Sequence, residues 1–99
     1  MEQRKAQRFD LRLPLEVIRQ GTESLSEQCE TRNMSSVGVL FEAEGDADLK
    51  IGESVEYMIT LPTSPGSKDR VRLHCLGKVV RLAQAAGVAA TLERYEFVR

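Results

Sequence analysis

Apolar and polar residues alternate along several short stretches of this chain. Residues 55–61 show the pattern most clearly, because an apolar residue stands at every odd-numbered position. A period of two is typical of a half-buried strand. The same period covers residues 11–17, where Pro14 favours a sheet edge or the start of a strand. A weaker alternation over residues 25–31 predicts an antiparallel return through a turn at residues 20–22.

Turn-forming residues separate these stretches from two further predicted strands. Residues 33–36, Asn-Met-Ser-Ser, interrupt the pattern with loop formers, and the mostly apolar residues 38–43 follow as a short strand. The turn-rich residues 62–67 precede another strand at residues 70–81. Gly77 lies inside that strand, where a glycine indicates a bulge or a bend that would suit a closed sheet.

The alanine-rich residues 82–90 admit two interpretations. Their composition suits a helix, but Gly87 interrupts the helical stretch. We favour a turn at residues 84–87 that leads into a last strand at residues 88–92. Six short strands, with no strongly periodic helix between them, predict an all-β fold: an antiparallel barrel whose closure hides the sheet edges.

Length and charge narrow the classes of protein that this chain can represent. Its 99 residues and 11.1 kDa fit a single domain, 1–99, with residues 1–10 as a flexible arm outside the barrel. The formal net charge of -1 gives no global attraction to nucleic acid or to an anionic membrane, so any anion site must be local. The first residues are charged and polar, and no apolar run is long enough to span a membrane, so we expect a cytoplasmic protein.

Catalysis and metal binding find little support in the sequence. His74 is the only histidine, and its neighbours along the chain offer no nucleophile and base, so we interpret it as structural. Cys29 and Cys75 lack metal-ligand spacing. We expect free, reduced thiols, with a single disulfide in an exported protein as the alternative. The sequence therefore predicts no catalytic residue, no metal and no cofactor, and a protein that is not an enzyme.

Positive charge is concentrated near the N-terminus, at Arg4, Lys5, Arg8 and Arg12. The planar guanidinium of arginine can donate two hydrogen bonds to a phosphate or to the O6/N7 edge of guanine, and it can stack on a base. Two such arginines could grip a nucleotide. A solvated, mobile basic terminus is the alternative that a short charge run alone would favour.

A second polar group occupies the turn before residues 38–43. Asn33 can pair with a base edge or cap the turn, and Ser35 can bind a phosphate or the local backbone. Gly38 permits a close backbone approach or a positive φ. Taken alone, this sequence is more often an ordinary Asx turn.

The two groups together resemble the motifs of a known family. Residues 4–8, Arg-Lys-Ala-Gln-Arg, and 33–38, Asn-Met-Ser-Ser-Val-Gly, resemble the RxxxR and (D/N)xSxxG motifs of PilZ domains. Residues 49–52, 77–81 and 87–90 also follow the family's layout, so the resemblance covers nearly the whole chain. It implies a six-stranded antiparallel PilZ-like barrel that binds cyclic di-GMP, a bacterial second messenger, often as an intercalated dimer.

The resemblance also assigns roles by motif position. Arg4 and Arg8 would hold guanine and phosphate groups from the flexible arm, while Asn33, Ser35 and Gly38 would face them from the barrel. The chain after residue 92 leaves room for at most a short C-terminal helix, where the family often has a longer one.

Three further cations, Lys5, Arg12 and Arg81, are accessory candidates for the same ligand. Arg8 with Arg12 also fits RxxxR, but the distance to the first strand favours Arg4 with Arg8.

The expected mechanism is closure of the arm over the nucleotide, which alters a surface that a downstream protein or a fused domain reads. The alternative is a non-binding PilZ-like interaction module. A small barrel that binds single-stranded nucleic acid is a third class, and the aromatic content of only 5% counts against it because such sites stack bases on aromatic rings.

Overall fold

The computed structural model describes residues 9–43, 48–62, 71–82 and 87–98, and within them the chain forms seven strands and no helix. All strand pairs are antiparallel, which confirms the predicted all-β class. The strands are β1 (Pro14–Gln20), β2 (Glu23–Met34), β3 (Gly38–Ala43), β4 (Ser54–Thr60), β5 (Arg72–Leu82), β6 (Gly87–Thr91) and β7 (Arg94–Val98).

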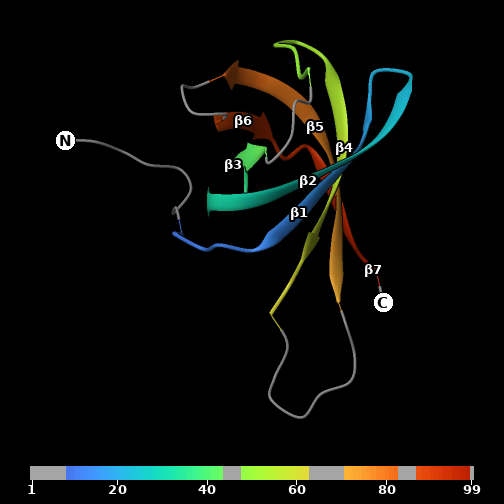
Figure 1. Ribbon diagram of the computed structural model, residues 1–99. Helices are drawn as coiled ribbons and strands as arrows, with labels where there is room; N and C mark the ends of the chain where they lie inside the picture. The colour runs from blue at the N-terminus through green and yellow to red at the C-terminus, as the bar shows by residue number, and fades with distance from the viewer. Residues whose placement is uncertain (1–8, 44–47, 63–70, 83–86, 99) are drawn as a thin grey trace, which may run out of the picture.

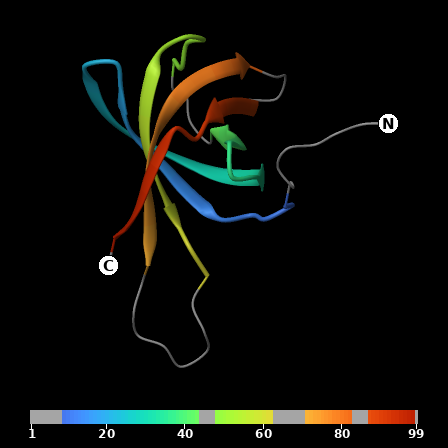
Figure 2. The same cartoon turned by 180° about the vertical axis from the view of Figure 1, so that it is seen from behind.

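Six of these strands close into a barrel. Their order is β4-β1-β2-β3-β6-β5, and β5 also pairs with β4, so the sheet returns to its first strand. Figures 1 and 2 show the curved strands around a common interior. The seventh strand, β7, pairs with β5 alone. The predicted six-stranded antiparallel barrel is therefore confirmed, with one strand added.

The first two strands form as the sequence predicts, with a later start. Pro14 is the first residue of β1, the position in a strand where its missing N–H costs least. Arg12 therefore lies before the strand and not on it. Gly21 turns the chain between β1 and β2 with φ 60°, in the left-handed region that glycine enters without steric cost.

The barrel interior is filled by alternate residues of the strands. Those exposed by 1% or less include Leu15, Val17, Phe41, Tyr57 and Ile59, which come from β1, β3 and β4. The odd-numbered residues of 55–61 that the pattern marks as apolar thus point inward, apart from partly buried Leu61. Burial raises the pKa of Tyr57, whose hydroxyl donates to the Thr91 carbonyl at 3.0 Å.

Both cysteines are buried in this core, and neither forms a disulfide. Burial raises the pKa of Cys75 to about 12, so its thiol stays protonated at neutral pH. The expectation of free thiols is confirmed. The one buried polar side chain of the described core, Thr31, is satisfied by backbone: it accepts from the Leu13 N–H at 2.8 Å and donates to the Leu11 carbonyl.

Gly77 is not the site of the bulge that the sequence indicated as one possibility. No shift of register falls there, because Gly77 pairs regularly with Val55. The bulge of β5 lies further on, between Val79 and Arg81. The requirement for glycine comes instead from the corner between β6 and β7: a Cβ at residue 77 would lie 1.8 Å from the Thr91 carbonyl oxygen.

The remaining differences concern element boundaries. Strand β2 runs to Met34, so Asn33 lies in a strand and the loop shortens to residues 35–37. The end of the chain forms strand β7 where at most a short helix was expected. The strand interpretation of residues 88–92 is confirmed by β6, whereas most of the turns predicted at 62–67 and 84–87 lies outside the described residues. None of the described residues belongs to a helix able to cross a membrane.

Candidate functional site

A bulge in β2 places Asn33 on the outer face of the barrel. Thr31 lies opposite Phe41, and the next pair is Asn33 with Leu40, so Arg32 is an extra residue without a partner in the ladder. In a regular ladder, Arg32 would stand opposite Leu40 and the next residue would point inward. The shift therefore turns the Asn33 side chain outward.

A second bulge, in β5, does the same for Arg81. Val79 lies opposite Ala90, and Arg81 lies opposite Ala89, so Val80 is the extra residue. Without this shift, Arg81 would face Val88 on the core side. The bulge thus directs a guanidinium outward, and within the described residues Arg81 has no ion pair or hydrogen bond.

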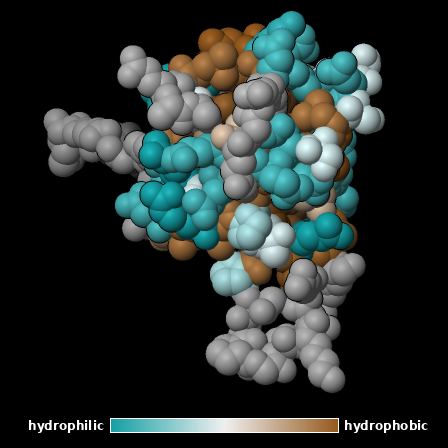
Figure 3. Space-filling model, viewed as in Figure 1, coloured by the Kyte–Doolittle hydropathy of each residue, from teal (hydrophilic) through white to brown (hydrophobic). Residues whose placement is uncertain are grey.

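The two bulged strands lie on either side of β3 and β6, so that Asn33, Leu40, Ala89 and Arg81 form one row across four strands. A surface hollow of about 220 Å³ lies along this row. Apolar side chains form much of its lining, and exposed hydrophobic residues are seen elsewhere on the surface too, as Figure 3 shows for one face. Among the residues that the structure describes, no carboxylate lines the hollow. A shallow apolar floor with a cation and an amide at its two ends suits a flat anionic ligand.

The turn between β2 and β3 contributes a hydroxyl to the hollow. The Ser35 N–H donates to the Gly38 carbonyl at 2.9 Å, and the Ser35 Oγ accepts from the Val37 N–H at 3.2 Å. The hydroxyl's own contact as donor, to the Gly38 carbonyl, is long at 3.5 Å. Ser35 therefore holds the turn in shape with a lone pair, and its proton is available to a phosphate oxygen.

Gly38 serves the close approach of two strands and has no positive φ. A Cβ at this position would lie 3.0 Å from the Ala90 carbonyl oxygen. Of the two reasons for glycine that the sequence leaves open, the structure supports the first. The glycine keeps β3 close to β6 at the floor of the hollow.

The chain enters the barrel beside this turn. Phe9 and Met34 exchange two backbone hydrogen bonds, from the Phe9 N–H to the Met34 carbonyl at 2.8 Å and from the Met34 N–H to the Phe9 carbonyl at 2.9 Å. Met34 lies between Asn33 and Ser35 in the sequence. The point where residues 1–8 join the described chain is therefore fixed at the edge of the hollow.

The basic residues of the sequence separate into different groups. Arg4, Lys5 and Arg8 lie outside the described residues. Arg12 does not line the hollow; its Nη1 forms an ion pair with Glu30 at 3.2 Å, with both side chains at least half exposed.

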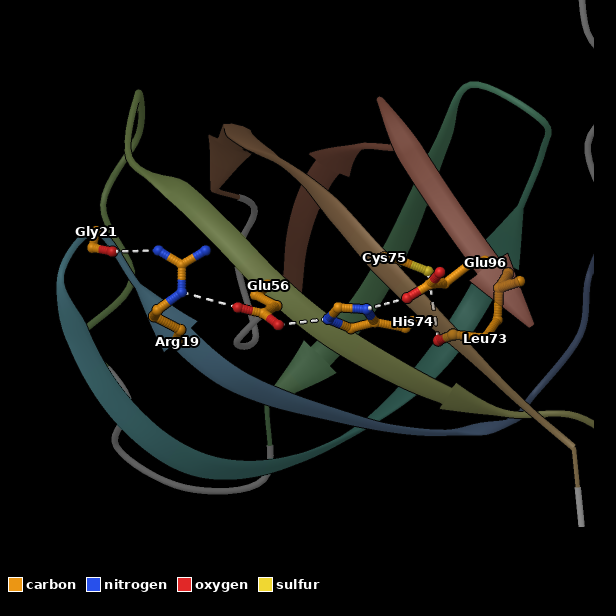
Figure 4. A network of polar contacts seen from close by, with 7 residues as sticks. All are labelled: Arg19, Gly21, Glu56, Leu73, His74, Cys75 and Glu96. Atoms are coloured by element: carbon orange, nitrogen blue, oxygen red, sulfur yellow. Dashed lines mark hydrogen bonds and ion pairs between the residues drawn. The ribbon is translucent and has the colours of Figure 1, made fainter. Parts of the chain in front are cut away.

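A second polar cluster, which the sequence did not reveal, crosses the outer face of β1, β4, β5 and β7 (Figure 4). Arg19 Nε donates to Glu56 at 2.8 Å, His74 Nε2 contacts the same carboxylate, and His74 Nδ1 lies 3.4 Å from Glu96. The Arg19 guanidinium holds the pKa of Glu56 below its usual range, and Glu56 raises the pKa of His74. These partners are distant from His74 in sequence, so only the strand register brings them together. Both ring nitrogens of His74 thus have a carboxylate partner, which agrees with the interpretation of His74 as a structural residue.

A larger hollow of about 450 Å³ lies beside this cluster. Its lining carries both signs of charge, the carboxylates of Glu93 and Glu96 together with Arg94 and His74. The smaller hollow is lined by a cation without a carboxylate among the described residues, and is therefore the better candidate for an anion.

A model of the PilZ domain family matches residues 2–96, and the chain belongs to that family. PilZ domains are binding and regulatory modules, generally receptors for cyclic di-GMP. Among solved structures, the fold is similar to that of the Bacillus subtilis inhibitor of motility MotI/DgrA, with a TM-score of 0.69 and 19% sequence identity. That similarity covers 100% of this chain and 44% of the other, so this chain spans less than half of its length. A search of curated protein sequences gave no match.

Proposed function

We propose that this protein is a cyclic di-GMP receptor whose ligand lies in the hollow between the β2–β3 turn and Arg81. The observation that carries the proposal is the Phe9–Met34 pair, which anchors the arginine-bearing segment at the rim of a hollow whose described lining holds no carboxylate. Membership of the PilZ family supports the same ligand. Two phosphates make that ligand a compact dianion, which requires positive charge placed locally.

The N-terminal arginines supply that charge in the proposed complex. Arg8 is joined directly to Phe9, and Arg4 is four residues further away, within about 14 Å of chain at full extension. Both guanidiniums can therefore reach a ligand in the hollow and donate paired hydrogen bonds to its phosphates or guanine edges. Lys5 and Arg12 add accessory charge.

The barrel supplies the facing groups. The amide of Asn33 offers a donor and an acceptor to a base edge, and the Ser35 hydroxyl donates to a phosphate oxygen. Gly38 leaves the floor free of a side chain, while Arg81 binds from the opposite wall. No bond of the ligand is broken: the protein acts by binding, without catalysis and without a cofactor.

Binding acts as a switch in this proposal. The domain comprises residues 1–99, and its arm, residues 1–10, closes over the nucleotide because the ligand contacts the closed form alone. Closure reshapes a surface that a cytoplasmic protein partner, or a fused domain, reads.

Isothermal titration of the 99-residue chain with cyclic di-GMP tests the proposal. We expect saturable binding that Arg8→Ala weakens at least tenfold, because one charge-assisted hydrogen bond is worth about 1.5 to 3 kcal/mol. Arg12→Ala is the comparison within the same basic stretch: it should weaken binding much less than Arg8→Ala, because Arg12 adds only accessory charge and pairs with Glu30 outside the hollow. Binding that Arg12→Ala abolishes and Arg8→Ala leaves intact would reverse the assignment of RxxxR. No heat at millimolar nucleotide would leave the non-binding interaction module as the function.

A further inference from the structure

Strand β7 ends the sheet with one unpaired edge. It pairs with β5 from Arg72↔Val98 to Leu76↔Arg94, and no other described strand pairs with it. Figures 1 and 2 show β7 running along β5, which pairs with β4 over the same residues. An unpaired edge presents backbone N–H and C=O groups that another strand can complete.

Two aromatic side chains stand on one face of this strand. Tyr95 and Phe97 are 58% and 66% exposed, and their rings meet edge to face at 6.2 Å. Aromatic residues are scarce in this chain, and Phe41 and Tyr57 already lie in the core at 0% exposure. Exposed aromatic surface beside an open strand edge is typical of a protein–protein interface.

The charged residues of β7 complement those of β7 in a second copy of the chain. Within the described residues Arg94 has no ion pair, and the Glu96 side chain is 73% exposed although it contacts His74. An antiparallel pair of β7 strands related by a two-fold axis at Tyr95 sets Arg94 of each copy opposite Glu96 of the other. An axis at Glu96 would instead oppose two like charges, which is unfavourable directly across strands. An axis at Arg94 would likewise oppose two guanidiniums, so among the registers centred on residues 94–96 the charges favour the one about Tyr95.

We propose that β7 is a dimerisation edge, on which a second copy of this chain adds its own β7 antiparallel about Tyr95. The two sheets then continue through the interface, with two Arg94–Glu96 ion pairs on one face and the Tyr95 rings adjoining on the other. The contact is isologous, so it closes at two chains and does not propagate into a fibre. This inference is independent of nucleotide binding.

Sedimentation velocity of the full chain over a range of concentrations tests the proposal. We expect the wild type to pass from 11.1 kDa to twice that mass as concentration rises. Arg94→Glu and Glu96→Arg should each weaken self-association at least tenfold, because every copy would then carry like charges at the paired positions. An equimolar mixture of the two variants should recover the dimer, because one copy then carries two carboxylates at positions 94 and 96 and the other carries two guanidiniums. Far-ultraviolet circular dichroism checks that each variant keeps its strands.

Three results would overturn the proposal. A wild type that stays at 11.1 kDa up to about 1 mM has no dimer of this kind. Variants that associate as strongly as the wild type would place the interface elsewhere. Folded variants that stay monomeric when mixed would exclude an antiparallel β7–β7 contact through these charges, because the mixture sets carboxylates on one strand opposite guanidiniums on the other.

Discussion

Of the glycines at positions 21, 38, 52 and 77, Gly77 has the least room for a side chain. The carbonyl oxygen and carbon of Thr91 lie 1.8 and 2.7 Å from the place where its Cβ would be. Both are backbone atoms, so no side chain can rotate away to make room. The chain turns from β6 into β7 at this contact, and β5 changes neighbour from β7 to β6 along the same edge.

Gly77→Ala is therefore expected to lower the free energy of unfolding by about 3 kcal/mol, because inserting a methyl into a filled site forces the backbone to move. Gly52→Ala is the control: its φ of 92° strains an alanine, but nothing lies within 4 Å of the added methyl. That strain alone costs about 1 to 2 kcal/mol. Urea unfolding measures both. A loss at Gly77 no larger than at Gly52 would contradict the close contact.

At the scale of elements, the two bulges decide which side chains form the candidate site. They fall at Arg32 and Val80, residues with no sequence signal for a bulge, so a regular alternation would place Asn33 and Arg81 on the core side. The motif resemblance identified Asn33 without its strand context. The strands themselves were predictable because their period of two reflects burial, whereas register shifts depend on the partner strand.

Arg81→Ala should weaken cyclic di-GMP binding about tenfold, because the hollow loses its described cation and one charge-assisted hydrogen bond. Lys78→Ala is the control, since it removes a positive charge from the same strand at a residue that does not line the hollow. The same titration compares the two. Equal losses would mean that only general charge matters, and no loss at Arg81 would remove it from the site.

The row Arg19–Glu56–His74–Glu96 joins β1, β4, β5 and β7, and its strength depends on pH. Glu56 raises the pKa of His74 above its usual value of 6.5. The protonated imidazole therefore stabilises the fold fully below pH 6.5, and this stabilisation is lost as the pH rises through the raised pKa. Arg19 lowers the pKa of Glu56 below its usual value of 4.5. The ionised Glu56 therefore stabilises the fold fully above pH 4.5, and this stabilisation is lost as the pH falls through the lowered pKa. Both groups contribute their full stabilisation between pH 4.5 and pH 6.5.

We expect the free energy of unfolding to fall by about 1 kcal/mol between pH 6 and pH 8, an amount typical of a partly exposed ion pair. His74 is the only histidine, so His74→Gln should flatten this slope. Glu30→Gln, in the separate pair with Arg12, should keep it. Denaturant titrations across the pH range provide the measurement. A slope that persists in His74→Gln would assign it to another group.

At the scale of the whole molecule, the net charge is close to zero while a cation stands at one particular hollow. The net charge of -1 leaves no general attraction for polyanions, while the hollow has Arg81 in its lining and Phe9, where the arginine-bearing segment joins, at its edge, with no carboxylate among its described lining residues. The balance of charge was evident from composition. The lack of acidic residues in the described lining of the hollow could not be predicted from composition, because it depends on which residues four strands bring to the same face.

Barrel closure sets the order in which this molecule can become competent to bind. The walls of the hollow come from β2–β3 and β5–β6, and they meet only when β3 pairs with β6, from Gly38↔Thr91 to Glu42↔Gly87. Pairing across about half of the chain is slow compared with forming the β1–β2 hairpin, because a long loop must first be closed. A refolding chain is therefore expected to acquire local strands before the proposed nucleotide site, and recovery of cyclic di-GMP binding would report formation of the β3–β6 ladder.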